Sequence, residues 1–221
     1  MANKHLIVVE GTDGSGKSTQ QDLLAQRLAD LGVKFRRVRF PRYGQRSCAL
    51  VEMYLGGEFG SHPGDVNPYA SSSFYAVDRF ASYTTDWKQD YENGVLILCD
   101  RYTTSNAVHQ AEKLEGEERI AFLDWLFDFE YNKIGLPAPD RVFFLDMPSQ
   151  VAFDLIGKRQ GDKGDIHELD HDYLEKCRES ALELCGRYGW HRVQCAPDNK
   201  LRTVQEINDE LLHGVLEALK N

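Results

Sequence analysis

The stretch 6–19, LIVVEGTDGSGKST, constrains this chain more than any other part of it. Residues with a strong strand preference run directly into the pattern Gly-x-x-x-x-Gly-Lys-Ser at 11–18, and a helical pattern of leucines follows until Gly32. A strand, a glycine-rich loop and a helix in this order are the context in which the pattern forms a phosphate-binding loop, or P-loop. The sequence therefore predicts a nucleotide site built around the first strand.

The residue types in this loop follow from the chemistry of binding phosphate. Glycines let the backbone wrap closely, so that successive N–H groups and the start of a helix point at one anion. Lys17 adds a mobile cation for the β- and γ-phosphates, and Ser18 adds a hydroxyl ligand for Mg²⁺. The residues that we expect to hold the nucleotide are Gly11, Asp13, Gly14, Ser15, Gly16, Lys17, Ser18 and Thr19.

Length and charge narrow the class of protein. A chain of 221 residues suits one domain, 1–221, with a well-filled core. Its 26 basic and 35 acidic residues give a net charge of −9, which argues against nucleic acid or an anionic membrane as the main partner. No leader-like start and no apolar run near 18 residues is present, so we expect a cytoplasmic protein. The five scattered cysteines are expected to be reduced packing residues.

Short strand-like segments alternate with helical patterns along the whole chain. Helical patterns are expected after the P-loop, over one long segment at 67–93, and after an acidic break at 115–118. This alternation predicts a doubly wound α/β fold with a mainly parallel, five-stranded sheet. The expected strands are 6–10, 33–40, 95–99, 141–146 and 192–195.

Charged residues follow two of these strands at the sheet edge where ligands bind in open parallel sheets. Arg42 follows the second strand, and Asp100 and Arg101 follow the third. An acid at such a strand tip, beside a P-loop, is a typical partner of a magnesium-bound water. Tyr75 and Arg79 stand four residues apart on one helical face, so they offer a flat ring and a forked donor to the same ligand.

The segment 158–170, KRQGDKGDIHELD, has no apolar period and lies between two helices. It is either a solvated connector or a lid that closes over the phosphates and excludes water.

Several strings together resemble the thymidylate kinase family, whose members phosphorylate dTMP to dTDP with ATP. They cover nearly the whole chain in the family's order: EGTDGSGKSTQ, FPRYG, DRYTTSNA, LPAPDRVFFLDMP and GDIHELD, with the Tyr75 and Arg79 helix between the second and the third. The resemblance implies a P-loop nucleotide kinase with a lid, ATP and Mg²⁺ as cofactors, nucleotides as its small-molecule partners, and a homodimer.

The resemblance also implies roles for individual residues. Lys17 and Ser18 would handle ATP and magnesium, with Asp100 as a second metal residue, and Asp13 would face the acceptor 3′-hydroxyl or the metal. The residues that would bind the acceptor are Arg42 and Arg101 at its phosphate, Tyr75 stacked on thymine, and Arg79 and Asn106 at the base edge beside Ser105. Arg159 would come down from the lid with Lys158 and Lys163, and Asp165 and Glu168 would border the sugar.

The chain departs from the family pattern at three places. Gly14 replaces an arginine that some members carry in the P-loop, and the lid segment has one arginine and two lysines where arginine-rich lids are usual. His109 stands where an aromatic ring normally lies against the sugar. These differences bear on rate and on the choice of sugar or base.

Two other functions stay open at this point. A deoxynucleoside kinase must remove a proton from a sugar hydroxyl, and Asp100 or Glu10 could do so, whereas the phosphate of dTMP has a second pKa of about 6 and needs no base. A non-catalytic GTP switch would carry Asn-Lys-x-Asp, but this chain has only Asn199-Lys200-Leu201-Arg202.

Overall fold

A computed structural model describes residues 3–160 and 171–220 of the chain. Its centre is one five-stranded sheet in the order β2-β3-β1-β4-β5, and all neighbouring strands are parallel. The predicted doubly wound α/β fold is confirmed. The strands are β1 (Leu6–Glu10), β2 (Phe35–Arg39), β3 (Leu96–Asp100), β4 (Arg141–Asp146) and β5 (His191–Gln194).

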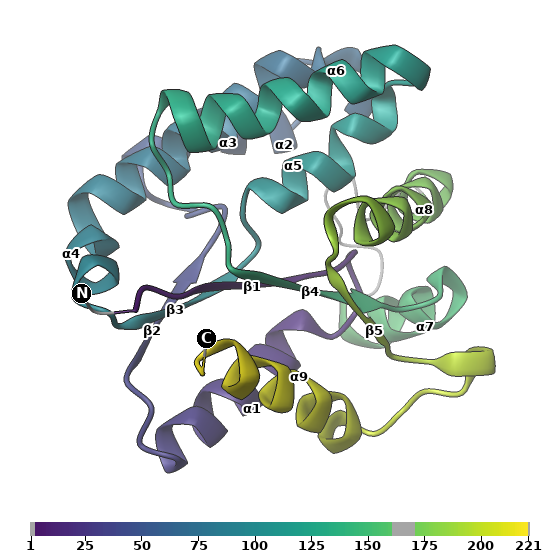
Figure 1. Ribbon diagram of the computed structural model, residues 1–221. Coiled ribbons are helices and arrows are strands. Elements are labelled where there is room, and N and C mark those ends of the chain that lie inside the picture. Colours follow the sequence, from purple (N-terminus) through teal and green to yellow (C-terminus); the bar gives the residue numbers. More distant parts are fainter. Residues whose placement is uncertain (1–2, 161–170, 221) are drawn as a thin grey trace.

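Helices cover both faces of the sheet (Figure 1). One face carries α1 (Lys17–Asp30), α7 (Ser149–Gln160) and α9 (Val204–Ala218). The other face carries α2 (Ala49–Leu55), α3 (Pro68–Ser82), α4 (Lys88–Glu92), α5 (Thr103–His109), α6 (Gly116–Phe127) and α8 (His171–Tyr188). Among the described residues no helix is long and apolar enough to cross a membrane.

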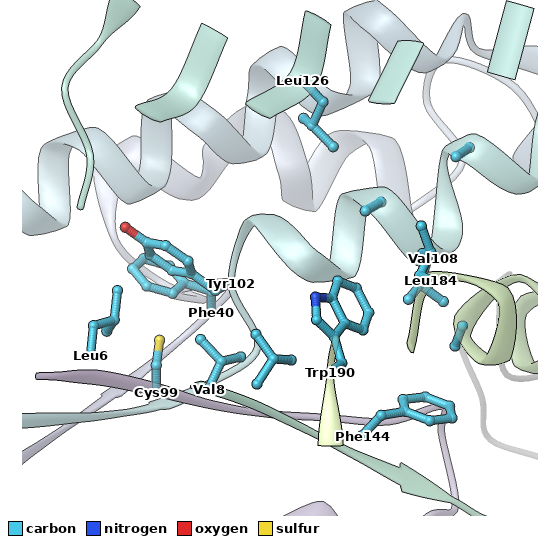
Figure 2. Close-up of a cluster of buried hydrophobic side chains, with 14 of the residues drawn as sticks. Leu6, Val8, Phe40, Cys99, Tyr102, Val108, Leu126, Phe144, Leu184 and Trp190 are labelled. Carbon is cyan, nitrogen blue, oxygen red and sulfur yellow. The ribbon is translucent and has the colours of Figure 1, made fainter. Parts of the chain in front are cut away.

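The two faces have separate hydrophobic cores because successive side chains of a strand point to opposite sides. In β1, Leu6 and Val8 pack into the core under α5, α6 and α8, part of which Figure 2 shows, whereas Ile7 and Val9 pack toward α1 and α9. All five residues of β1 are buried, as expected for a central parallel strand covered on both faces.

Three of the strands differ from their predicted bounds by one or two residues, and two predicted helical segments differ more. The expected single helix 67–93 is α3 and α4 joined by a π-helical segment, Tyr83–Trp87. Hydroxyls of Thr84 and Thr85 donate to the carbonyls of Phe80 and Ala81, at 2.8 and 2.6 Å, and so compete with the backbone for those acceptors.

The second difference is at the acidic break expected over 115–118. The structure begins α6 at Gly116, and Glu117 and Glu118 lie in its first turn. Negative charges are favourable there because they meet the positive end of the helix dipole. A second π-helical segment, Asp128–Lys133, follows α6 directly.

The strand order places the P-loop beside a crossover point. β1 lies between β3 and β4, so the chain crosses from one side of β1 to the other after β3. In open α/β sheets the carboxyl ends of the strands at such a point form the ligand crevice. Glu10, Asp100 and Asp146 are the last residues of β1, β3 and β4.

Candidate active site

The P-loop has the backbone that its glycines predict. Gly16, the residue before α1, has φ 83°, a left-handed conformation that costs a residue with a side chain about 1–2 kcal/mol. At Gly11 an added Cβ would lie 2.5 Å from the Ser15 Oγ and 3.2 Å from the Leu145 carbonyl. Both glycines are therefore required by the shape of the loop.

Lys17, the first residue of α1, is folded back onto this loop. Its Nζ donates to the carbonyls of Gly11 and Thr12, at 2.6 and 2.9 Å, and lies 3.8 Å from the Asp13 carboxylate. Burial, together with the nearby Arg101, lowers the pKa of Lys17 to about 8. A phosphate near this ammonium group would remove that penalty.

One cavity of about 550 Å³ joins the P-loop to residues from α3, α5 and the ends of β2 and β3. This volume lies in the range of small-molecule sites. The predicted residues that line it are Asp13, Gly14, Ser15, Gly16, Lys17, Ser18, Thr19, Tyr75, Arg79, Asp100, Arg101, Ser105, Asn106 and His109.

Arg101 turns its side chain into this cavity from a strained backbone. Its φ is 63°, which a residue other than glycine rarely adopts and which often marks a functional site. The guanidinium donates to Asp13 at 2.5 Å and lies 3.6 Å from Glu10. Burial opposes its charge, but the carboxylates of Asp13, Glu10 and Asp100 outweigh burial and raise the pKa of Arg101.

Glu10 is fully buried beneath the loop, and hydrogen bonds engage both of its carboxylate oxygens. One oxygen accepts the Gly11 N–H at 3.0 Å. The other accepts the hydroxyls of Thr104 and Ser105, at 2.9 and 2.6 Å. Glu10 thus ties the start of the P-loop to the first turns of α5.

A buried ion pair forms the wall of the cavity at α3. Arg79 and Glu130 have side-chain exposures of 1% and 0%, and the Arg79 Nε donates to Glu130 at 2.7 Å while its Nη2 bonds the other oxygen. Nη2 also donates to the Asn106 Oδ1 at 2.9 Å. Burial opposes the charge of Arg79, but Glu130 more than offsets it and raises the pKa of Arg79.

Tyr75 and His109 complete the predicted acceptor side. The Tyr75 ring meets Tyr54 edge to face, with centroids 6.4 Å apart. The His109 Nε2 lies 3.3 Å from an Arg101 nitrogen, and its Nδ1 lies 3.4 Å from the Cys177 Sγ on α8. The cavity therefore has a ring from α3 and an imidazole from α5 in its lining.

Arg42, predicted to bind the acceptor phosphate, is not among the lining residues of the cavity, and neither is Gly11 of the P-loop. Its Nε lies 3.4 Å from Asp78 and its Nη2 donates to Ser47 at 3.1 Å. Asp78 also accepts the Arg42 backbone N–H at 2.9 Å. The two arginines predicted to share an acceptor phosphate thus have different carboxylate partners.

The oxygen donors in the cavity suit magnesium. Ser18 and Asp100 both line it, and Asp100 lies 3.4 Å from the Arg39 Nε. Mg²⁺ is typically held by one or two protein oxygens together with waters and substrate phosphates. A hydroxyl and a carboxylate beside a phosphate-binding loop fit that donor set.

The predicted lid contacts are not tested by the structure. Lys158 and Arg159 belong to the last turn of α7, but the described side chains do not include theirs. Lys163, Asp165 and Glu168 lie outside the described residues.

The sequence analysis did not predict the structural roles of three buried carboxylates. Glu130 and Asp78 hold the two arginines Arg79 and Arg42, and Glu10 was considered only as a possible base. A carboxylate inside an aromatic-rich segment, such as Glu130 in FDFEY, was the available signal for a buried ion pair.

Comparison with known proteins agrees with this geometry. A family model described as thymidylate kinase matches residues 9–207. The thymidylate kinase of Mycobacterium tuberculosis H37Rv is 32% identical over 190 residues, which are 84% of this chain and 87% of the relative. That of Thermosynechococcus vestitus is 28% identical over 97% of this chain and 90% of the relative. The probable thymidylate kinase of Thermococcus kodakarensis is 29% identical over 96% and 97%. The chain belongs to the thymidylate kinase family.

Proposed function

We propose that this protein transfers the γ-phosphoryl group of ATP to dTMP and releases ADP and dTDP. Membership of the thymidylate kinase family supports a nucleotide kinase. The observation that carries the proposal is a single cavity in which the P-loop, Arg101, and the Tyr75, Arg79 and Asn106 wall meet. Such a cavity can hold a triphosphate and a base-bearing acceptor together.

On the donor side, residues 13–19 would receive the phosphates of ATP on backbone N–H groups and the start of α1. Lys17 would exchange its two loop carbonyls for phosphate oxygens, a stronger partner for a buried ammonium. Ser18 and Asp100 would hold Mg²⁺, which neutralises charge on the phosphates when bound. Phosphoryl transfer needs such alignment and charge neutralisation more than covalent help.

On the acceptor side, Arg101 would bind the dTMP phosphate and Tyr75 would stack on the base. Arg101 already touches Asp13 in the P-loop, so one side chain links the two halves of the site. Ser105 and His109 line the same cavity and would border the nucleotide. Arg42, held by Asp78, would reach the acceptor phosphate only after its side chain turns.

The need for a general base distinguishes the two possible acceptors, because a nucleoside needs one and dTMP does not. The dTMP phosphate is largely ionised at pH 7, whereas a 5′-hydroxyl must lose a proton in the transfer. Glu10, one of two candidate bases, has both oxygens occupied by Gly11, Thr104 and Ser105. This arrangement supports a positioning role for Glu10 and weakens the deoxynucleoside kinase alternative.

The proposal also includes the domain organisation, oligomeric state, location and lid that the resemblance implies. The chain would act as one domain, as a homodimer, in the cytoplasm, with segment 158–170 as its lid. Arg159 would then contribute to kcat more than to KM, because its charge would meet the phosphoryl group after closure.

An assay of ADP release against a panel of nucleosides and nucleoside monophosphates tests the proposal. We expect dTMP to be preferred to thymidine by at least 100-fold in kcat/KM, because thymidine lacks the group that Arg101 binds. Equal use of thymidine and dTMP would assign the protein to the nucleoside kinases. ATP turnover that does not depend on any acceptor would remove both assignments.

A further inference from the structure

His109 is the last residue of α5, and its imidazole ring lies in contact with both Arg101 and α8. It is 7% exposed and is one of the residues that line the cavity. Its Nε2 lies 3.3 Å from the Arg101 Nη1. Its Nδ1 lies 3.4 Å from the Cys177 Sγ and 3.5 Å from the Tyr173 hydroxyl. The ring therefore connects an arginine of the cavity with two side chains of α8.

The contact with Arg101 determines which ring nitrogen carries the proton. A guanidinium has donors only and stays charged in a folded protein. The Nε2 of His109 must therefore be the acceptor, which leaves the proton of a neutral ring on Nδ1. Free histidine prefers the other tautomer, so the neighbours of the ring impose this one.

Helix α8 supplies acceptors for the proton on Nδ1. The Tyr173 hydroxyl donates to the backbone carbonyl of His109 at 3.0 Å, so its oxygen can accept from Nδ1. The sulfur of Cys177, one helical turn further along, is a weaker acceptor. Burial raises the pKa of both Tyr173 and Cys177, so both groups stay uncharged. These contacts favour the same tautomer that Arg101 requires.

A neutral acceptor suits an arginine that must receive an anion. Arg101 already has Asp13 at 2.5 Å and Glu10 at 3.6 Å, and the charge of Asp100 also acts on it. A further carboxylate in place of His109 would repel a phosphate, whereas a neutral imidazole holds Nη1 without adding negative charge. We propose that His109 is a positioning residue that accepts from Arg101 and so directs its guanidinium to the acceptor phosphate.

This inference rests on the proposed function, because it takes Arg101 to bind the phosphate of dTMP. Its first test needs no ligand. Proton–nitrogen correlation spectra of isotope-labelled protein at about pH 7.5, above the usual pKa of histidine, report which nitrogen of each imidazole carries the proton. The chain has seven histidines, and the signals of His109 are those missing from His109→Gln. We expect a protonated Nδ1 and an unprotonated Nε2, and the opposite tautomer would overturn the proposal.

The second test compares the affinities for dTMP and thymidine, measured by calorimetry, because these ligands differ only in the phosphate. His109→Phe keeps an aromatic ring and removes the acceptor, so the ratio of dTMP to thymidine affinity should fall about five- to tenfold. His109→Gln is the matched variant, since it loses the ring but has a neutral acceptor oxygen, and it should keep the ratio within about twofold. If His109 only packs against the sugar, neither substitution would change the ratio.

An Arg101→Ala background shows whether His109 acts through the arginine. There, His109→Phe should lower the ratio no further, because the group that His109 positions is already gone. The proposal is overturned by an unchanged ratio in folded His109→Phe, by an equal fall in His109→Gln, or by a further fall in the double variant. If a thermal melt shows that His109→Phe does not fold, His109→Leu removes the acceptor with a smaller side chain and should lower the ratio in the same way.

The two tests separate failure of this inference from failure of the proposed function. Wild-type protein that binds dTMP and thymidine equally would overturn the proposed function, and the phosphate role of Arg101 with it. The wrong tautomer of His109, or any of the three variant results above, would overturn this inference and leave the proposed function intact.

Discussion

On the P-loop side of the cavity, the described lining residues come from one stretch, 13–19, whereas the Arg79 side is assembled from α3, α5 and the segment Asp128–Lys133. Lys17 bonds carbonyls 6 and 5 residues away, but Arg79 bonds side chains 51 and 27 residues away. We call the P-loop side the phosphate wall and the Arg79 side the base wall, after the roles proposed for them. The phosphate wall is a property of local sequence, and the base wall is a property of helix packing.

The buried cations on the two sides, Lys17 and Arg79, differ in their carboxylate partners and in the direction of their pKa shifts. Burial disfavours the charge of both Lys17 and Arg79, but Arg79 has Glu130 in forked contact, whereas the nearest carboxylate to Lys17 lies 3.8 Å away. The pKa of Lys17 is accordingly lowered to about 8, and that of Arg79 is raised. From this difference we expect Lys17 to exchange its partners for the phosphates of a ligand, and Arg79, which Glu130 already neutralises, to keep its contacts.

We expect the largest effect from removing the ammonium group of Lys17. Lys17→Ala should lower kcat at least 100-fold, the usual scale for losing one preorganised donor to a transition-state charge. The melting temperature should change little, because burial of the Lys17 ammonium group is itself unfavourable. Steady-state kinetics and a thermal melt measure both quantities. Near-normal turnover would remove Lys17 from the phosphate wall.

Arg101 joins the two walls, and Arg101→Ala should lower kcat/KM for dTMP at least tenfold. The reason is the loss of a charge-assisted hydrogen bond, worth about 1.5–3 kcal/mol. Binding of thymidine, which has no phosphate, serves as the control and should fall much less. Arg42→Ala should have the smaller effect of the two arginine variants, because Asp78 and Ser47 hold that guanidinium outside the cavity lining. The reverse order would reassign the phosphate contact to Arg42.

Tyr75 tests whether the base wall binds by stacking. Tyr75→Ala should weaken dTMP binding by about 1–3 kcal/mol, the usual contribution of an aromatic ring to a stacked base. Tyr75→Phe keeps the ring face and should have a mild effect. Calorimetric titration and a thermal melt separate binding from stability. A sharp loss of melting temperature with unchanged dTMP affinity would make Tyr75 a packing residue next to Tyr54.

The smallest expected effect is a proton taken up when ATP binds. The pKa of Lys17 is about 8 without ligand, below its usual 10.5, and phosphate charge should raise it again. At pH 8 about half of the free protein has a neutral Lys17, so binding should take up roughly half a proton, and ATP affinity should fall as pH rises above 8. Calorimetry in two buffers of different ionisation enthalpy measures this uptake. Lys17→Ala should abolish it, and equal uptake in that variant would assign the proton to another group.

Local patterns in the sequence were sufficient to predict much of this molecule. The P-loop needs left-handed glycines and a strand and helix on either side, all of which lie within 6–30. The central strands β1 and β3 were predicted because buried parallel strands are continuous apolar runs, whereas β2 was predicted from the alternation of its residues. The placement of Arg101 followed from its position directly after β3.

Local sequence patterns could not predict which groups the charged side chains contact. Arg42 was predicted to share a phosphate with Arg101, but Asp78 on α3 lies against it. Nothing local in the sequence relates Glu130 to Arg79, because the π-helical segment after α6 is what turns Glu130 into the core. The hydroxyls that occupy Glu10 likewise come from the start of α5, 94 and 95 residues away.

The sequence by itself therefore determined the fold class, the phosphate loop and the set of residues at the carboxyl edge of the sheet. Backbone conformation and apolar periodicity are short-range properties, and both can be read within one or two turns or strands. The tertiary structure decided which of those residues are held by ion pairs and hydrogen bonds, and which carboxylates hold them. Hydrogen-bond geometry between distant segments depends on how helices pack, and distances within about 3.5 Å decide it.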